Sequence, residues 1–163
     1  MVNLMSDDKQ TLKAVPVRRR SAARLAAVQI IYQTLITNES AINFAPQFLA
    51  HYAGDLAKSF KVKNLDKEHL NALYAGVEYD VVNIDVAIAS QLAEGWSLDR
   101  LARIELSVLR CGAHELRSMP HIPARAVVSE YAALSDACGC DVGFVNAVLD
   151  NMAHDARTVE MGK

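Results

Sequence analysis

The chain has 163 residues, of which 52% are hydrophobic and 22% charged, and its net charge is −2. This composition is that of a folded single domain rather than a disordered chain, and no apolar run reaches the roughly 20 residues that a membrane span needs. Because the sequence has no secretion signal and an odd number of cysteines, three, we expect a cytoplasmic protein with reduced thiols and no disulfide framework.

The first 32 residues concentrate positive charge. They contain four arginines and two lysines against two aspartates, a charge of +4, which leaves −6 for the remaining 131 residues. Arg18, Arg19 and Arg20, here called the arginine arm, stand just before the first predicted helix, where cations oppose the helix dipole. An anion bound at that helix start would remove the penalty. The pattern therefore favours a polyanion such as RNA over a merely solvated helix start, and we expect residues 1–17 to be a flexible tail.

Apolar residues at three- and four-residue steps predict the first helix, from Ser21 to near Asn38. Ser40 is a candidate cap for a second helix, which Pro46 bends or delays and which stops at Gly54. A polar connection follows, with lysines at four positions: Lys58, Lys61, Lys63 and Lys67.

The segment VVNIDVAIA, residues 81–89, alternates in the way that a strand does. Apolar steps of three or four residues nevertheless continue from Leu70 to Leu92. A strand of that length is unusual, whereas a helix of that length is ordinary. We therefore predict one long helix here, capped by Asp66 and stopped by Gly95, with no strand.

Three further helices are predicted in the C-terminal part. The first starts at Ser97 and runs to near Ser118, the prolines of MPHIP then enforce a turn, and the other two cover residues 124–139 and 142–156. Since no hairpin signature or internal repeat is present, the fold class is all-α, a single-domain helical bundle of about six or seven helices. Its expected divisions are the flexible tail, a domain over residues 18–156 and a frayed C-terminus over residues 157–163.

Metal and enzyme chemistry find little support in the residue pattern. Cys111, His114, Cys138 and Cys140 could supply four metal ligands, but CGC has a single residue between its cysteines, unlike the usual zinc spacings. The sequence has no nucleophile elbow, phosphate loop or metalloprotease motif. Duplex DNA is also a poor fit, because the candidate recognition helix at residues 142–151 has no Arg or Lys. We expect no metal, no cofactor and no catalysis.

The sequence contains ARLAAVQIIYQ at residues 23–33 and, between residues 105 and 153, a run from ELSVLRCGAHEL to FVNAVLDNMA. These two stretches resemble the NusB family of bacterial transcription antitermination factors. The first is similar to the arginine-led first helix of that family. The second is more specific, since ELSVLRCGAHEL, HIPARAVVSEYAALSDACG and FVNAVLDNMA follow one another between residues 105 and 153. LYAGV at residues 73–77 is also similar.

The resemblance implies an all-helical factor that binds BoxA-type single-stranded leader RNA of ribosomal RNA operons together with the ribosomal protein NusE. The pair joins an RNA polymerase antitermination complex. Carried over by position, the residues implied to contact RNA are Arg18, Arg19, Arg20 and Arg24, and those implied to face NusE are Glu105, Asp141 and Phe144.

Two positions depart from the pattern of the family. Leu25 stands where a glutamate is frequent, and Gly143 stands where a lysine or arginine is common, which removes one phosphate contact. The Phe144 side chain is either buried in the core or exposed as a central contact in a protein interface. The alternative function is a helical protein–protein adaptor without direct RNA binding. The residues leave open whether the chain is a monomer or a homodimer.

Overall fold

The protein is an all-helical bundle, as the sequence predicts. The computed structural model describes the backbone of residues 2–162 and the side chains of residues 18–162. Its described residues form seven α-helices and one 3-10 turn, with no strand among them. In chain order the elements are α1 (Val2–Thr37), α2 (Ala41–Ser59), α3 (Lys67–Tyr79), α4 (Val81–Ala89), the 3-10 turn η1 (Leu98–Arg100), α5 (Arg103–Ser118), α6 (Ala124–Ala137) and α7 (Val142–Ala156). Helix α1 begins at Val2 rather than at the predicted Ser21. Arg18, Arg19 and Arg20 therefore lie within the helix and not at its start, so the helix-dipole argument for an anion there does not hold. The flexibility predicted for residues 1–17 stays a prediction.

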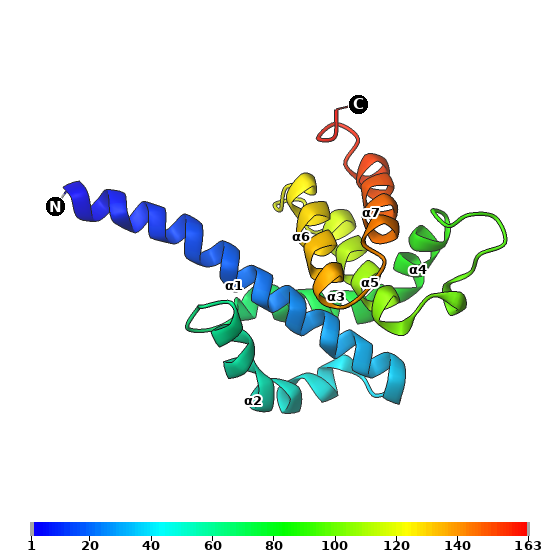
Figure 1. The fold of residues 1–163 in the computed structure, drawn as a ribbon, viewed down its shortest axis with the longest axis horizontal. Helices are drawn as coiled ribbons and strands as arrows, with labels where there is room; N and C mark the ends of the chain where they lie inside the picture. The colour runs from blue at the N-terminus through cyan, green and yellow to red at the C-terminus, as the bar shows by residue number, and fades with distance from the viewer. Residues whose placement is uncertain (1, 163) are drawn as a thin grey trace.

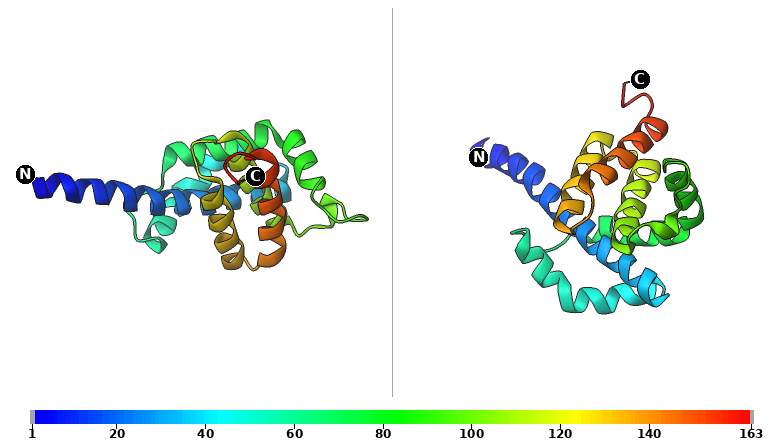
Figure 2. Two further views of the ribbon diagram at one scale, coloured as in Figure 1. Left: turned by 90° about the horizontal axis from the view of Figure 1, so that it is seen from above. Right: turned by 45° about the vertical axis from the view of Figure 1, so that its right-hand side comes forward.

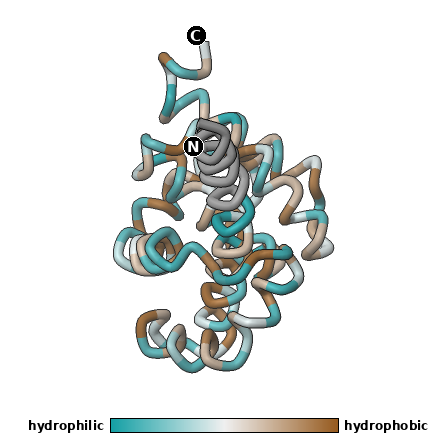
Figure 3. The backbone as a smooth tube through the Cα atoms, turned by 90° about the vertical axis from the view of Figure 1, so that its left-hand side faces the viewer, coloured by the Kyte–Doolittle hydropathy of each residue, from teal (hydrophilic) through white to brown (hydrophobic). Residues whose placement is uncertain are grey.

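Helix α5 lies at the centre of the bundle. It packs against α1, α3, α4, α6 and α7, and ten of its sixteen residues are buried. Gly112 permits the close approach of α7, because a Cβ at this position would lie 2.9 Å from Leu149 Cδ1. Helices α6 and α7 lie side by side on one side of α1, and α2 lies on the other (Figures 1 and 2). Hydrophobic and hydrophilic stretches alternate along the helices, as amphipathic packing requires (Figure 3).

Helix α2 extends past the predicted stop at Gly54, to Ser59. A glycine inside an exposed helix costs only about 1 kcal/mol, and burial of Leu56 and Ala57 beyond it offsets that cost. Ser40 stands at the N-cap position as predicted, but its side chain makes no capping hydrogen bond to α2. The Ser40 hydroxyl donates to Glu78 Oε1 at 3.0 Å, and the other oxygen of that carboxylate accepts from the Ala41 amide at 3.0 Å. A glutamate of α3 thus caps α2.

The single helix predicted from residue 66 to residue 95 is two helices, α3 and α4, joined at Asp80. Asp66 does cap α3, since its carboxylate accepts from the His69 amide at 3.1 Å. The absence of a strand over residues 81–89 is confirmed. The apolar period continues across the break because both helices bury the same stripe, which includes Val77 and Ile84. Helix α4 then ends at Ala89, and the predicted stop, Gly95, lies in the following loop with a φ of +88°.

The helix predicted from Ser97 begins later than expected. Ser97 precedes only the 3-10 turn, where its hydroxyl donates to the Asp99 carboxylate, and α5 starts at Arg103. The end of α5 at Ser118 and both bounds of α7 are as predicted. Helix α6 ends at Ala137, two residues before the predicted glycine.

Two residues of the described C-terminal segment, Arg157 and Met161, are buried, whereas Val159 between them is 96% exposed. The Arg157 side chain is 8% exposed and donates to the carbonyls of Glu115, Leu116, Met119 and Ile122 at 2.7–3.0 Å. These carbonyls lie at and just beyond the end of α5. A single arginine, which the apolar pattern does not reveal, thus satisfies the helix end, while fraying of residues 157–163 stays a prediction.

Candidate nucleic-acid and protein-binding surfaces

The arginine arm lies against the loop that leads into α3. The Arg19 guanidinium donates to the Leu65 carbonyl at 3.3 Å, and the Arg19 carbonyl accepts from the Asp66 amide at 3.1 Å. Arg20 Nε lies 3.9 Å from Asp66 Oδ2, and Arg18 is exposed. The Nε atoms of Arg19 and Arg20 are buried and have no hydrogen-bond partner among the described residues, so an external anion cannot reach them. The arm is held against the loop, while Arg18 is exposed and the side chains of Arg19 and Arg20 are partly exposed.

Arg24 differs from the arm, although the sequence places it in the same set. Its side chain is 3% exposed and holds both oxygens of the Glu115 carboxylate, with Nε at 2.8 Å and a terminal nitrogen at 2.9 Å. The other terminal nitrogen lies 3.2 Å from Glu130, and the guanidinium lies 5.8 Å from the centre of the Tyr131 ring. Such an arginine has no face left for a phosphate. The structure therefore separates Arg24 from the RNA-contacting candidates and gives it a role in packing.

A buried polar cluster surrounds Glu115, and we call its members Arg24, His69, Glu115 and Tyr131 the Glu115 cluster. Besides Arg24, the carboxylate is contacted by His69 Nε2 at 3.2 Å and accepts from the Tyr131 hydroxyl at 2.5 Å. The cluster ties together α1, α3, α5 and α6. Sequence patterns missed it because these residues are far apart along the chain and polar, so neither periodicity nor motif spacing relates them.

The ionisation of this cluster follows from its contacts. Burial alone would raise the pKa of Glu115, but hydrogen bonds from His69 and Arg24, with the charge of Arg24, lower that pKa to about 2. For Arg24, burial opposes the charge, yet the bond to Glu115 raises its pKa. Burial, and then the charge of Glu115, raise the pKa of Tyr131. At neutral pH the cluster holds an ion pair inside the bundle.

The three residues predicted to face a protein partner do lie together. Glu105 Oε2 accepts from the Asp141 amide at 3.0 Å, and Asp141 Oδ1 accepts from the Phe144 amide at 3.1 Å, as a cap of α7. Glu105, Asp141 and Phe144, here called the partner face, join the first turn of α5 to the first turn of α7. Phe144 is half-buried, whereas Val148 and Met152 below it are each 3% exposed. Val148 and Met152 therefore face the core, whereas Phe144 packs against it only in part.

A hollow of about 340 Å³ opens over the partner face. Leu92, Trp96 and Arg100 form its other wall, and the Arg100 guanidinium lies 4.6 Å from the centre of the Trp96 ring. Trp96 is 51% exposed. Sequence analysis missed these residues because they belong to the connection between α4 and α5, which was assigned to helix. A lone tryptophan in a glycine-containing loop was the available signal.

The two candidate surfaces are well separated. In Figure 1 the loop between α2 and α3, which the arginine arm contacts, lies at one side of the molecule. The connection between α4 and α5, which borders the partner face, lies at the opposite side. A ligand bound at one surface therefore does not cover the other surface, so two ligands can bind at once.

The cysteines are separate thiols. Burial raises the pKa of Cys111, and burial together with nearby Cys138 and Glu105 raises the pKa of Cys140 to about 11, so both stay protonated at neutral pH. Within the described residues no three His, Cys, Asp or Glu side chains gather in a way that could hold a metal ion. Nor is any described helix long and apolar enough to cross a membrane.

Comparisons with known proteins converge on one family. A family model described as the NusB family matches residues 21–154. The transcription antitermination protein NusB of Rhodopseudomonas palustris is 34% identical over 168 residues, covering 98% of this chain and 99% of its own. That of Nitrobacter winogradskyi is 37% identical over 161 residues, with 98% and 99% covered.

Solved structures agree in fold. NusB of T. maritima superposes with a TM-score of 0.69 at 24% identity, over 90% of this chain and 97% of that one. A crystal structure of the antitermination factors NusB and NusE in complex with dsRNA superposes with a TM-score of 0.68 at 24% identity, over 85% and 98%.

Proposed function

This chain belongs to the NusB family, and on that premise we propose that it is a transcription antitermination factor that binds BoxA-type single-stranded leader RNA together with NusE. Its relatives are antitermination proteins rather than enzymes, so the expected action is assembly and not catalysis. The RNA polymerase elongation complex is then an indirect partner, which the assembled RNA and proteins join.

The RNA surface that we propose is the arginine arm. Arg18 is exposed and Arg19 and Arg20 are partly exposed, so the arm presents three cations beside the loop that leads into α3. Arginine recognises phosphate oxygens through paired, charge-assisted hydrogen bonds. The polarity of the chain, positive in its first 32 residues and negative elsewhere, supports the same assignment.

The NusE surface that we propose is the partner face with its hollow. Phe144 and Leu92 offer an apolar floor, while Glu105 and Asp141 place two carboxylates at the edge. Such a surface suits a partner that inserts an apolar side chain beside a basic one. A related solved complex, of NusB with NusE and dsRNA, supports the choice of NusE.

The observation that carries the proposal is the coexistence of these two surfaces on opposite sides of one NusB-family chain. The small size of the RNA surface explains why a protein partner is needed for RNA binding. Three arginines neutralise few phosphates, and single-stranded binding loses affinity with salt at a slope of about 0.7 per contact. NusE would add contacts that the chain alone lacks.

The test is an RNA mobility shift with the purified chain, alone and with NusE, at two salt concentrations. We expect weak binding of BoxA RNA by the chain alone and stronger binding with NusE, which persists at the higher salt concentration. NusE binding with no RNA shift at either salt concentration would establish the adaptor alternative instead. Sedimentation of the same samples distinguishes a monomer from a homodimer.

A further inference from the structure

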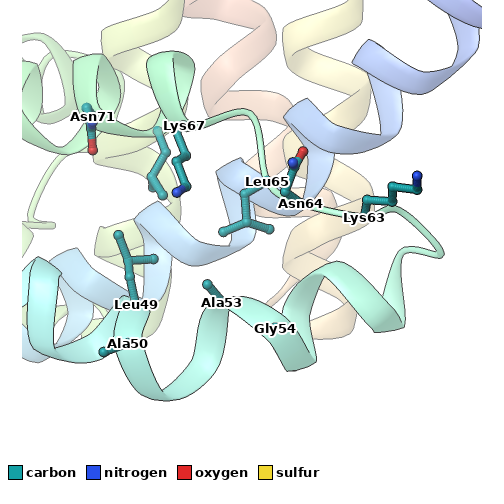
Figure 4. A pocket seen from close by; sticks show the side chains of 10 residues that line it. Leu49, Ala50, Ala53, Gly54, Lys63, Asn64, Leu65, Lys67 and Asn71 are labelled. Carbon is teal, nitrogen blue, oxygen red and sulfur yellow. The ribbon is translucent and has the colours of Figure 1, made fainter.

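A second hollow, of about 440 Å³, opens between α2 and α3 on the same side as the arginine arm. Its floor is apolar, formed by Leu49 of α2 with Leu65 and Leu70. Its rim is polar, and Figure 4 shows Asn71 on α3 and the Lys67 amine reaching over the gap toward α2. This volume lies in the range of about 300–1,000 Å³ that is usual for small-ligand sites.

The hollow and the arm form one continuous surface. Leu65 contributes its side chain to the floor of the hollow, while its carbonyl accepts from the Arg19 guanidinium at 3.3 Å. The next residue, Asp66, lies 3.9 Å from Arg20 and is followed at once by Lys67. Because Leu65 contacts both the arm and the hollow, an extended ligand bound to the arm lies next to the hollow.

The electrostatics of this surface select a polyanion. The arginine arm and residues 55–68 together carry seven lysine and arginine side chains against three carboxylates, in a chain whose net charge is −2. One of those carboxylates, Asp66, is already engaged by the His69 amide and by Arg20. An acidic peptide would also satisfy the charge, but a nucleotide adds a planar ring for the leucine floor and an edge of donors and acceptors for the Asn71 carboxamide.

We propose that this hollow receives one nucleobase of the bound RNA, with Lys67 and the arginine arm holding the phosphates on either side. The inference rests on the proposed function and extends it to a base-binding site. The leucine floor excludes water from one face of the base, and the Asn71 carboxamide can both donate to and accept from the base edge. Because only the base enters, this site reads the RNA, whereas the arm merely positions it.

The experiment fills the hollow without altering any charge. Gly54 lines the hollow, and a Cβ at this position would meet nothing within 4 Å, so the leucine side chain of Gly54→Leu has room to occupy the hollow. Because Gly54 lies inside α2, replacing the glycine by leucine also favours the helix. BoxA RNAs carrying a single abasic nucleotide, stepped along the sequence, are titrated with parent and variant in the presence of NusE. For the parent we expect one position at which loss of the base weakens binding about fivefold or more. For Gly54→Leu we expect weaker binding of intact RNA and no further loss at that position.

Two more variants sharpen the result. Asn71→Ala, at an exposed position, should reproduce the loss at the same nucleotide, and it keeps the test decisive if Gly54→Leu melts at a lower temperature. Arg117→Ala removes an exposed cation from a different hollow, between α4 and α7, and should bind like the parent.

The contrary outcomes are distinct. Parent-like RNA binding by Gly54→Leu and Asn71→Ala, or an abasic profile that Gly54→Leu leaves unchanged, overturns the base site. In either case the proposed function stands if alanines at the arginine arm still weaken RNA binding. A parent that binds no RNA even with NusE overturns both.

Discussion

At the scale of the residue, the most consequential side chain is Glu115. It is fully buried, and among the described residues its carboxylate is hydrogen-bonded by the other members of the Glu115 cluster. Removing one partner of a buried ion pair leaves an uncompensated charge, which is far more costly than losing a surface pair. The arginines of the first helix therefore fall into two energetic classes, even though they lie within seven residues of each other.

Arg24→Ala should lower the free energy of unfolding by about 3–5 kcal/mol, because the Glu115 carboxylate stays buried without its bidentate partner. Urea denaturation measures the change. Arg20→Ala is the matched control, since its pair with Asp66 is 3.9 Å long and partly exposed, and it should cost less than about 1 kcal/mol. An Arg24→Ala protein that is as stable as the parent but fails to bind RNA would return Arg24 to the RNA-contacting set.

Stability should also depend on pH through Glu115. Its pKa falls from an ordinary 4.5 to about 2 on folding, so between these values the folded state binds fewer protons than the unfolded one. The stabilisation is complete above pH 4.5 and is lost as pH falls toward 2. Urea midpoints measured across this range should decline more steeply for the parent than for Glu115→Gln. Glu130→Gln, at a partly exposed carboxylate, serves as control, and an equally steep decline in Glu115→Gln would contradict the assignment.

The sequence could not predict the Glu115 cluster for a definable reason. Periodicity identifies apolar positions, and Leu116, Leu109 and Val108 were recognisable as core on that basis. A glutamate within such a run shows no sign of its burial, and its partner Arg24 is 91 residues away. The family resemblance placed Arg24 with the arm, which is near it in sequence, but the burial of Arg24 sets the two apart.

At the scale of the element, the helices were predictable and their junctions were not. The apolar period predicted α6, α7 and the part of α1 from Ser21 onward, but not the start of α1 at Val2. That period marks a buried stripe, and such a stripe passes unchanged through the break at Asp80. Caps supplied from other elements are equally invisible: Glu78 of α3 caps α2, and Arg157 satisfies the end of α5. The components of the partner face were found through the family resemblance, whereas Trp96 was hidden by a misplaced helix start.

Arg157→Ala should destabilise the protein by about 3 kcal/mol or more, because four carbonyls near the end of α5 lose a buried, charged donor. Arg157→Lys should recover only part of the loss, since an ammonium lacks the planar fork that reaches several carbonyls at once. Thermal and urea unfolding measure both. Arg125→Ala, an exposed cation in the first turn of α6, is the control. Parent-like stability of a chain truncated after Ala156 would refute this role.

At the scale of the whole molecule, the proposal requires that RNA and NusE binding can be lost separately. Replacing the arginine arm by three alanines should weaken BoxA binding while NusE binding persists. The slope of the logarithm of RNA affinity against the logarithm of salt concentration should become about 2 less steep, because three contacts of about 0.7 each are lost. Phe144→Asp with Glu105→Lys should do the converse. Circular dichroism controls for folding, because Phe144 also packs on the core. If either set of changes abolishes both interactions in a folded protein, the two surfaces are not independent.

The position of Arg157 has a consequence for how the protein is made. Its contacts join the final residues of the chain to a helix end about forty positions earlier, with sequence separations of 35 to 42 residues. During translation the N-terminal part emerges first, at about 5–20 residues per second. The end of α5 therefore lacks its buried donor until Arg157 itself has been synthesised and can fold back. A product that stops before Arg157 lacks this contact, and its α5 end should be cut more readily by proteases than that of the parent.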